Sequence, residues 1–352
     1  MLRLAITLTL CFAGVARADR LVFRGQQGAL VGRVVSGGEE GVRIQVDDSQ
    51  SMQVVPWHEI REIQSTVRLP EQDALLKRGE RLWRARQRLV RGDITLAEPL
   101  FEQVFRELRG ASGSDARLAA EGLLRCRIAR GDILAAAEPL LETIRLDEAG
   151  VAPPFMELGP VIDPETGLSP GMPPVRIVLP AAEVLAPWIR GESTRAAAVA
   201  EGMLAMVDVD REAPSIPGVK DGGFLAQIIS VSDSARAGYG KARSDLEKAL
   251  PTLVPWRAMW ARWFLARGMR TTGDDADRRA AMLHLAHVAA EHEASQRWLA
   301  GAAMLLLADE LDKDGRVEQA DRIRIELATT IPAHPLLRDS SRMNIEKDGT
   351  TP

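Results

Sequence analysis

Hydrophobic and polar residues alternate in the first part of the chain and follow a helical spacing in the rest. Val42, Ile44 and Val46 alternate with polar neighbours, which is the pattern of a strand with one buried face. Glycine-rich or Asp/Ser-rich turns separate the β-prone runs, which cover residues 21–24, 29–35, 42–46, 52–55 and a closing stretch that ends at 63. We therefore predict a small β module over residues 19–66.

After residue 67 the apolar residues recur at helical spacing, and two segments nearly repeat one another. Residues 82–102 read LWRARQRLVRGDITLAEPLFE, and residues 123–142 read LLRCRIARGDILAAAEPLLE. Their Arg-Gly-Asp triplets start 39 residues apart, at Arg91 and Arg130, and their Glu-Pro-Leu triplets start 40 residues apart. A period of about 35–45 residues predicts paired helices joined by a tight turn.

Each Arg-Gly-Asp triplet fits a turn between two helices. Gly92 or Gly131 can take the left-handed conformation that ends one helix. The following Asp93 or Asp132 can then cap the next helix. An adhesion motif would need the triplet at an exposed, mobile loop tip, so we interpret both triplets as structural turns.

Two resemblances extend this pattern. The turn glycine and aspartate, with Ala97 and Ala136 at close helix contacts, resemble tetratricopeptide-like repeats. The period exceeds the usual repeat of about 34 residues, and the Trp…Leu-Gly…Tyr set is missing. Gly32-x-Val34 and the ending VPWHEIREI at 55–63 resemble small SH3-like or Sm-like modules of exported bacterial proteins. Together they imply a mainly α fold: an α-helical solenoid of tetratricopeptide-like hairpins, preceded by a small β barrel that docks or assembles.

Breaks in the helical pattern set the expected organisation. Prolines crowd residues 151–180, which we predict to be a loop or linker between helical hairpins at 67–150 and further helical repeats at 181–335. The last hairpin has the clearest repeat pattern, with LAGAA at 299–303 and a turn at 314–316. Residues 336–352 form a polar tail that we expect to be disordered.

The amino terminus has the features of a secretory signal over residues 1–18. Arg3 precedes an apolar run, and Ala16-Arg17-Ala18 fits the small-x-small cleavage pattern. We expect cleavage after Ala18 and an exported protein, periplasmic or secreted. An uncleaved anchor or a buried helix is the alternative. No later segment has eighteen uninterrupted apolar residues, so we expect no transmembrane segment after signal removal.

Charge and cysteine content narrow the classes of partner. Loss of Arg3 and Arg17 would change the formal net charge from −4 to −6, which argues against a nucleic-acid partner because such binding needs a basic face. Only Cys126 would remain after cleavage, so no internal disulfide can form. Its apolar helical neighbours favour a buried structural thiol over a reactive one.

Two groups of polar residues could bind a metal ion. His284, His287 and Glu291 lie at i, i+3 and i+7 on one helical face, with His292 nearby. No fourth ligand is identifiable, and a solvated polar face is the simpler interpretation. A second stretch partly matches a calcium loop, but Glu and Asp are exchanged at its first and twelfth positions, so we interpret it as a repeat turn. It comprises Glu310, Asp312, Asp314, Gly315, Val317 and Asp321.

A row of aromatic residues is the candidate partner-binding face. Trp256, Trp260, Trp263 and Phe264 share one side of a predicted helix, at i, i+4, i+7 and i+8. Such a row could form a groove for a helix or peptide of a partner, or it could be a stripe of core residues.

The sequence favours a binding protein over an enzyme. It contains no nucleophile elbow, phosphate loop or dinucleotide fingerprint, so we expect neither catalytic residues nor a cofactor. We expect a non-catalytic protein–protein interaction scaffold of the bacterial cell envelope, with a protein or peptide partner. A self-assembling or cell-wall-docking structural protein is the alternative. A metal-dependent enzyme built on His284 and His287 is a remote one.

Overall fold

The structure is a computed structural model that describes residues 18–25, 28–46, 51–172, 181–191, 193–206, 211–212, 214–221, 223–290, 296–334 and 336–337. The chain divides into two compact units, Met1–Trp83 and Arg84–Pro352. The predicted signal segment, apart from Ala18, and the predicted tail after residue 337 lie outside the described residues.

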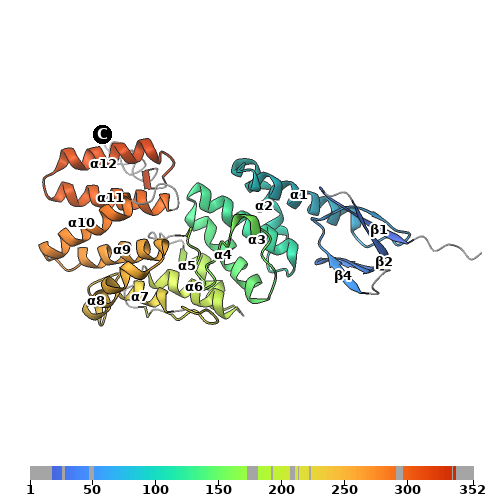
Figure 1. The fold of residues 1–352 in the computed structure, drawn as a ribbon, viewed down its shortest axis with the longest axis horizontal. Helices are drawn as coiled ribbons and strands as arrows, with labels where there is room; N and C mark the ends of the chain where they lie inside the picture. The colour runs from blue at the N-terminus through green and yellow to red at the C-terminus, as the bar shows by residue number, and fades with distance from the viewer. Residues whose placement is uncertain are drawn as a thin grey trace, which may run out of the picture. The chain divides into compact units, whose positions relative to one another are not determined.

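The first unit contains an antiparallel sheet of five strands in the order β4-β3-β2-β1-β5 (Figure 1). The alternation predicted from the sequence is present, since Val42 and Ile44 are buried and Arg43 between them is exposed. The strands are β1 (Asp19–Phe23), β2 (Ala29–Gly38), β3 (Gly41–Val46), β4 (Met52–Val55) and β5 (Ile60–Gln64).

The sheet is not closed into the barrel that we predicted. β4 pairs with β3 and β5 pairs with β1, and no pairing within the described strands joins β4 to β5. All four residues of β4 are paired with β3, from Val55 opposite Val42 to Met52 opposite Gln45. Because a strand has two hydrogen-bonding edges, β4 and β5 each keep one edge without a partner strand in this sheet.

A helix covers the buried face of the sheet. α1 (Gln72–Val90) places Leu75 and Leu76 against a core around Trp57, whose Nε1 donates to the carbonyl of Gly38 at 2.7 Å. Gly79 permits a close approach of helix and sheet, because a Cβ at this position would lie 2.2 Å from the Trp57 carbonyl oxygen. The core of the first unit therefore includes the start of α1.

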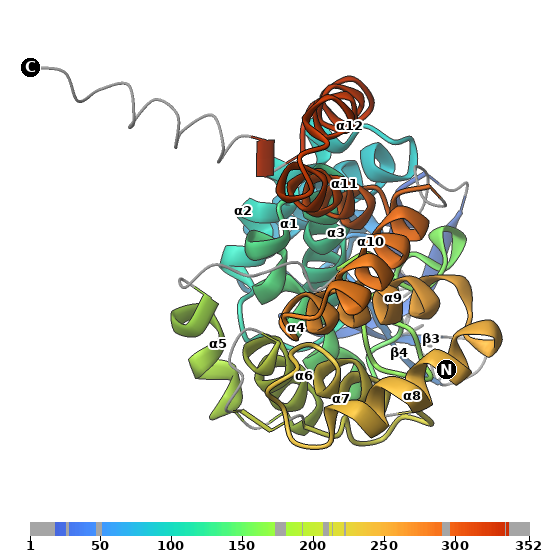
Figure 2. The ribbon, with the colours of Figure 1, turned by 90° about the vertical axis from the view of Figure 1, so that its left-hand side faces the viewer.

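The second unit is helical, which confirms the mainly α prediction. Consecutive helices lie beside one another, as Figures 1 and 2 show for α9 to α12, an arrangement compatible with helical repeats. The α-helices are α2 (Ile94–Glu107), α3 (Ser114–Arg130), α4 (Ile133–Glu148), α5 (Ala181–Ile189), α6 (Thr194–Ala205), α7 (Phe224–Ser230), α8 (Tyr239–Ala249), α9 (Pro255–Arg270), α10 (Asp275–Ala290), α11 (Arg297–Lys313) and α12 (Val317–Thr330). Two short 3-10 helices are η1 (Met156–Leu158) and η2 (Leu250–Thr252).

The predicted Arg-Gly-Asp turns are confirmed. Gly92 and Gly131 have φ angles of 81° and 75°, in the left-handed region that favours glycine. Asp93 and Asp132 cap the following helices, each through a side-chain hydrogen bond of 3.4 Å to a backbone N–H. The same triplet therefore ends one helix and starts the next in both hairpins.

One set of contacts departs from a linear array of repeats, in which each unit touches only its neighbours. Trp298 in α11 donates from Nε1 to the carbonyl of Ile128 in α3 at 2.7 Å, across 170 positions of sequence. Its ring lies against Gly131, where a Cβ would be 2.7 Å from it. Gln296 also donates to the carbonyl of Pro170 at 2.6 Å. The last hairpin thus contacts the hairpin of α3 and α4 directly, and the solenoid prediction is not confirmed.

Candidate functional site

Residues 151–172, which the sequence suggested as a loop or linker, form an ordered loop on the helical unit. Phe155 anchors this loop. Its buried ring lies 5.8 Å and 5.4 Å from the guanidinium carbons of Arg86 and Arg125. Met156, the next residue, is 76% exposed. A buried aromatic ring between two cations therefore holds a methionine at the surface.

Arg257 of α9 fixes the later part of the same loop. Asp163 accepts from the backbone N–H of Thr166 at 2.8 Å and so closes a tight turn. The Arg257 guanidinium donates to Asp163 at 3.3 Å and to Glu165 at 2.8 Å. It also donates to Asp221 at 3.0 Å. Arg257 thus ties two carboxylates of the loop, and the carboxylate of Asp221 outside it, to α9.

A hollow of about 310 Å³ opens between the loop and helices α3, α4 and α6. Ligand sites in proteins usually enclose roughly 300–1,000 Å³. The apolar part of the wall comes from the loop, and the charged part comes from the helices. We call this the loop hollow; its lining residues are Pro153, Phe155, Met156, Gly159, Pro160, Val161, Ile162 and Pro164 from the loop, and Arg117, Glu121, Asp147 and Arg195 from the helices.

The four charged residues of the loop hollow pair with one another. Buried Arg117 lies 3.3 Å from Glu121 and 3.6 Å from Asp147. Arg195 lies 2.9 Å from the same Asp147 carboxylate. Burial lowers the pKa of the Arg117 guanidinium, and the charges of Glu121 and Asp147 oppose that shift. Two cations and two anions face each other, so the lining carries no net charge.

This arrangement suits an uncharged, apolar ligand better than an ion. A charged group in the hollow would lose hydration and would compete with ion pairs that are already formed. An apolar side chain would instead remove the proline, valine and isoleucine surface from water, at roughly 25 cal/mol per Å². The chemistry of the lining is therefore that of a binding site for an apolar segment.

The loop hollow was not predicted from the sequence. Arg117, Glu121 and Arg125 follow one another at i, i+4 and i+8 in a helix that is otherwise rich in alanine and leucine. Charged residues at that spacing on a buried helix are a signal that could have been found. Phe155 and Arg195 give no such local signal, because their roles depend on contacts with distant helices.

The aromatic row predicted as a partner-binding face lies mostly in the core. Trp260, Trp263 and Phe264 are at most 4% exposed, and Trp256 alone of the four is partly exposed. Trp256 meets Trp260 edge to face, with 5.2 Å between ring centroids. A partner could reach this row through Trp256 only, unless the core opened. Its role in binding stays a prediction.

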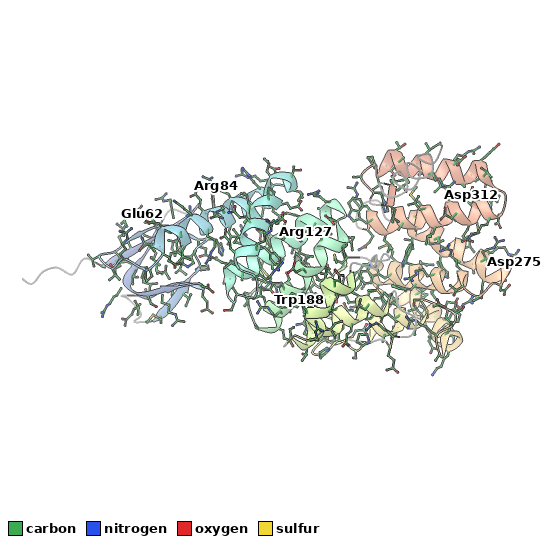
Figure 3. The ribbon with its side chains drawn as sticks, turned by 180° about the vertical axis from the view of Figure 1, so that it is seen from behind. Glu62, Arg84, Arg127, Trp188, Asp275 and Asp312 are labelled. Atoms are coloured by element: carbon green, nitrogen blue, oxygen red, sulfur yellow. The ribbon has the colours of Figure 1, made fainter. Side chains whose placement is uncertain are left out.

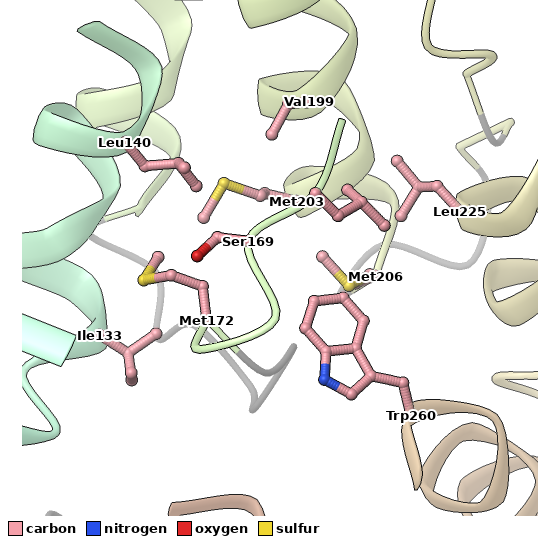
Figure 4. A pocket seen from close by; sticks show the side chains of 10 residues that line it. Ile133, Leu140, Ser169, Met172, Val199, Met203, Met206, Leu225 and Trp260 are labelled. Carbon is pink, nitrogen blue, oxygen red and sulfur yellow. The ribbon is translucent and has the colours of Figure 1, made fainter. Parts of the chain in front are cut away.

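A small pocket adjoins the aromatic row (Figure 4). Its volume is about 30 Å³, which is enough for a water molecule. Met172, Met203 and Met206 line much of it. Ser169 and Trp260 also line it, and neither the Ser169 hydroxyl nor the Trp260 Nε1 has a hydrogen-bond partner within the described structure. This pocket is therefore small and mostly apolar, and two polar groups beside it have no partner among the protein atoms of the described structure.

The predicted histidine pair has one partly buried and one exposed member. His284 lies with Nδ1 3.5 Å from Arg262, and His287 is exposed. Burial and the charge of Arg262 lower the pKa of His284 from 6.5 to about 4, so its ring is neutral at pH 7. Glu291 and His292 lie outside the described residues. Within those residues, no group of three or more His, Cys, Asp or Glu side chains is placed to hold a metal ion.

The stretch that partly matches a calcium loop is the turn between α11 and α12, as predicted. Gly315 has a φ angle of 73°, which ends α11 in the left-handed conformation. The carboxylates on either side of the turn each pair with an arginine (Figure 3 labels Asp312); they are Glu310, Asp312, Asp314 and Asp321. Three of these pairs join different helices, and the pair of Asp321 with Arg324 lies within α12.

Cys126 is a free, buried thiol, in agreement with the structural role predicted for it. Burial, together with the charge of Glu98, raises the pKa of this thiol to about 12. Since the thiolate is the reactive form, Cys126 is a poor nucleophile at neutral pH.

Comparisons with known proteins do not assign the chain to a family. It matches no protein-family model, no curated protein and no solved structure. The tetratricopeptide-like resemblance therefore rests on the repeated sequence motifs. The antiparallel sheet followed by helices is compatible with helical repeats after a β module. In the part of the chain that the structure describes, no helix has both the length and the apolar character needed to cross a membrane.

Proposed function

We propose that this protein is a non-catalytic protein–protein interaction scaffold of the bacterial cell envelope, and that the loop hollow holds an apolar segment of its partner. The observation that carries the proposal is the loop hollow itself, with its apolar walls, its mutually paired charges and the exposed Met156. Tetratricopeptide-like packing of the hairpins would supply the rigid support. The signal-like residues 1–18 support a location in the envelope.

Preorganisation is the physical argument for binding at this place. The loop is tied to the helices by the cations around Phe155 and by the carboxylates around Arg257. A loop that is already ordered loses little conformational entropy when a ligand binds. Methionine side chains adapt to different apolar surfaces, and Met156 would let the site accept a range of side chains.

Site-specific photo-cross-linking tests the proposal. A photoreactive amino acid replaces Met156 in the full chain, and the envelope fraction is irradiated and analysed by mass spectrometry. We expect one reproducible cross-linked protein from position 156. Leu283 on α10 is 68% exposed and is a matched control position that should yield none.

A second substitution checks that the cross-link depends on the hollow. Pro160→Asp would place a charge on an exposed lining residue and should lower the yield from position 156 at least fivefold. Equal yields from positions 156 and 283 would contradict the proposal. Trp260→Ala would not test the aromatic row in the same way, because the loss of a buried tryptophan costs about 3–5 kcal/mol of stability and would lower binding indirectly.

A self-assembling structural protein is the second candidate, and the two sheet edges favour it. Edge strands such as β4 and β5 offer unpaired backbone groups to another chain. Static light scattering of the full chain at increasing concentration tests this candidate. A dimer or larger assembly at micromolar concentration would support it, and a monomer throughout would exclude assembly as the main role.

A further inference from the structure

One face of the five-stranded sheet carries a mixed set of apolar and basic side chains. Alternation along β2, β3 and β4 places six residues on the side opposite to the buried core, and Val35, at the register shift between Val34 and Ser36, is exposed beside them. We call this set the outer sheet face; it comprises Val31, Arg33, Val35, Arg43, Gln45, Met52 and Val54. The register makes the set continuous across the three strands: Arg33 lies opposite Gln45, Gln45 lies opposite Met52, and Arg43 lies opposite Val54.

The apolar members of the outer sheet face are strongly exposed. The exposed fractions are 40% for Val31, 48% for Val35, 54% for Met52 and 48% for Val54. Inward-facing residues of the same strands, such as Ile44, are buried. The exposure of Val31 therefore follows from strand alternation, whereas Val35 lies at the register shift between Val34 and Ser36, and Met52 and Val54 belong to a strand in which Gln53 is exposed as well. Large apolar side chains gathered on one exposed face mark an interaction surface.

The charged residues of this side of the sheet are mainly basic. Arg33 and Arg43 belong to the outer sheet face, and Arg20 on the adjacent β1 points the same way. The acidic residue on this side of the described strands is Glu62 on β5 (labelled in Figure 3). Glu40 in the β2–β3 turn lies 4.0 Å from Arg43, but both side chains are more than half exposed, so this pair contributes little.

We propose that the outer sheet face docks on the surface of an anionic lipid bilayer. The four apolar side chains would enter the boundary between headgroups and acyl chains, and the arginines would bind lipid phosphates. Arginines near an anionic membrane surface are attracted to it, and salt weakens this attraction. A soluble polyanion such as single-stranded RNA would use the arginines but would leave the apolar side chains in water, so it fits this face less well.

This inference does not depend on the proposed function, because the outer sheet face and the loop hollow belong to different compact units. Docking through the sheet would hold the first unit at a membrane surface.

Co-sedimentation with vesicles tests the inference on the full chain. The vesicles contain either phosphatidylcholine alone or phosphatidylcholine with 30% phosphatidylglycerol. We expect binding to the phosphatidylglycerol vesicles at low salt. The double variant Val35→Asp/Val54→Asp should reduce that binding at least fivefold, because it places two negative charges on the face that meets the lipid. Both positions are exposed, so the sheet should stay folded. Circular dichroism checks that the fold is retained.

A matched double variant separates this effect from a general change of charge. Leu283→Asp/Ile325→Asp adds the same two charges at exposed positions of α10 and α12 and should bind like the unchanged chain. Any vesicle binding by residues 1–18 is common to both variants. Arg33→Gln/Arg43→Gln should remove the preference for phosphatidylglycerol.

Two results would overturn the inference. One is equal vesicle binding by the two aspartate variants. The other is binding of a single-stranded RNA oligonucleotide that depends on Arg33 and Arg43 but is insensitive to Val35→Asp/Val54→Asp, which would identify a polyanion site instead.

Discussion

At the scale of single residues, the buried hydroxyl of Ser169 has no hydrogen-bond partner among the protein atoms of the described structure. A buried polar group without a hydrogen bond costs about 1–3 kcal/mol, and the Ser169 hydroxyl is such a group in the described structure. Ser169→Ala should therefore raise the free energy of unfolding by about 1 kcal/mol in urea titrations. Ser193→Ala is the matched control and should lower it by about 1 kcal/mol, because the Ser193 hydroxyl caps α6. A loss of stability in Ser169→Ala would show that this hydroxyl has a partner.

His284 makes stability depend on pH. Its pKa is about 4 in the folded chain and near 6.5 when unfolded, so the unfolded state binds more protons between these values. Stability from the neutral ring is present above pH 6.5 and is lost as the pH falls toward 4. Between pH 7.5 and pH 4.5, the free energy of unfolding of the unchanged chain should fall. For His284→Gln the fall should be on the order of 2 kcal/mol smaller. Parallel pH curves for the two proteins would refute this expectation.

At the scale of elements, the two repeated turns differ in what surrounds their glycines. Gly92 and Gly131 are both left-handed, which costs an alanine about 1–2 kcal/mol. A Cβ at Gly92 would meet no atom within 4 Å, whereas one at Gly131 would lie 2.7 Å from the Trp298 ring. Gly131→Ala should therefore destabilise the fold by about 2 kcal/mol more than Gly92→Ala, measured by urea unfolding. Equal losses of stability in the two variants would mean that the Trp298 ring moves aside without an energetic penalty.

At this scale the local features of the fold were predictable from the sequence, and the long-range ones were not. The strands, the Arg-Gly-Asp turns and the turn at Gly315 were predictable, because alternation and capping involve residues only a few positions apart. The loop hollow was not, since Asp163 reaches its partner Arg257 across 94 positions. The open sheet was also missed, because the motifs near Trp57 describe strands and turns and do not determine whether the two edges meet.

At the scale of the whole helical unit, Trp298 should couple the stability of helices that are far apart in sequence. Trp298→Ala removes the hydrogen bond to Ile128 and the packing against Gly131. We expect backbone hydrogen exchange to become faster at the end of α3 as well as in α11 and α12, with little change in α7 and α8. Faster exchange confined to α11 and α12 would mean that the last hairpin is independent of the others.

The same contact sets a limit on how this chain could change length during evolution. Repeat proteins commonly gain or lose whole units by duplication or deletion, because a unit touches only its neighbours. An extra hairpin inserted between α4 and α11 would carry Trp298 away from the carbonyl of Ile128, and a deletion would do the same. We therefore expect related chains to keep a constant number of helices between these two residues and to vary in length outside that interval.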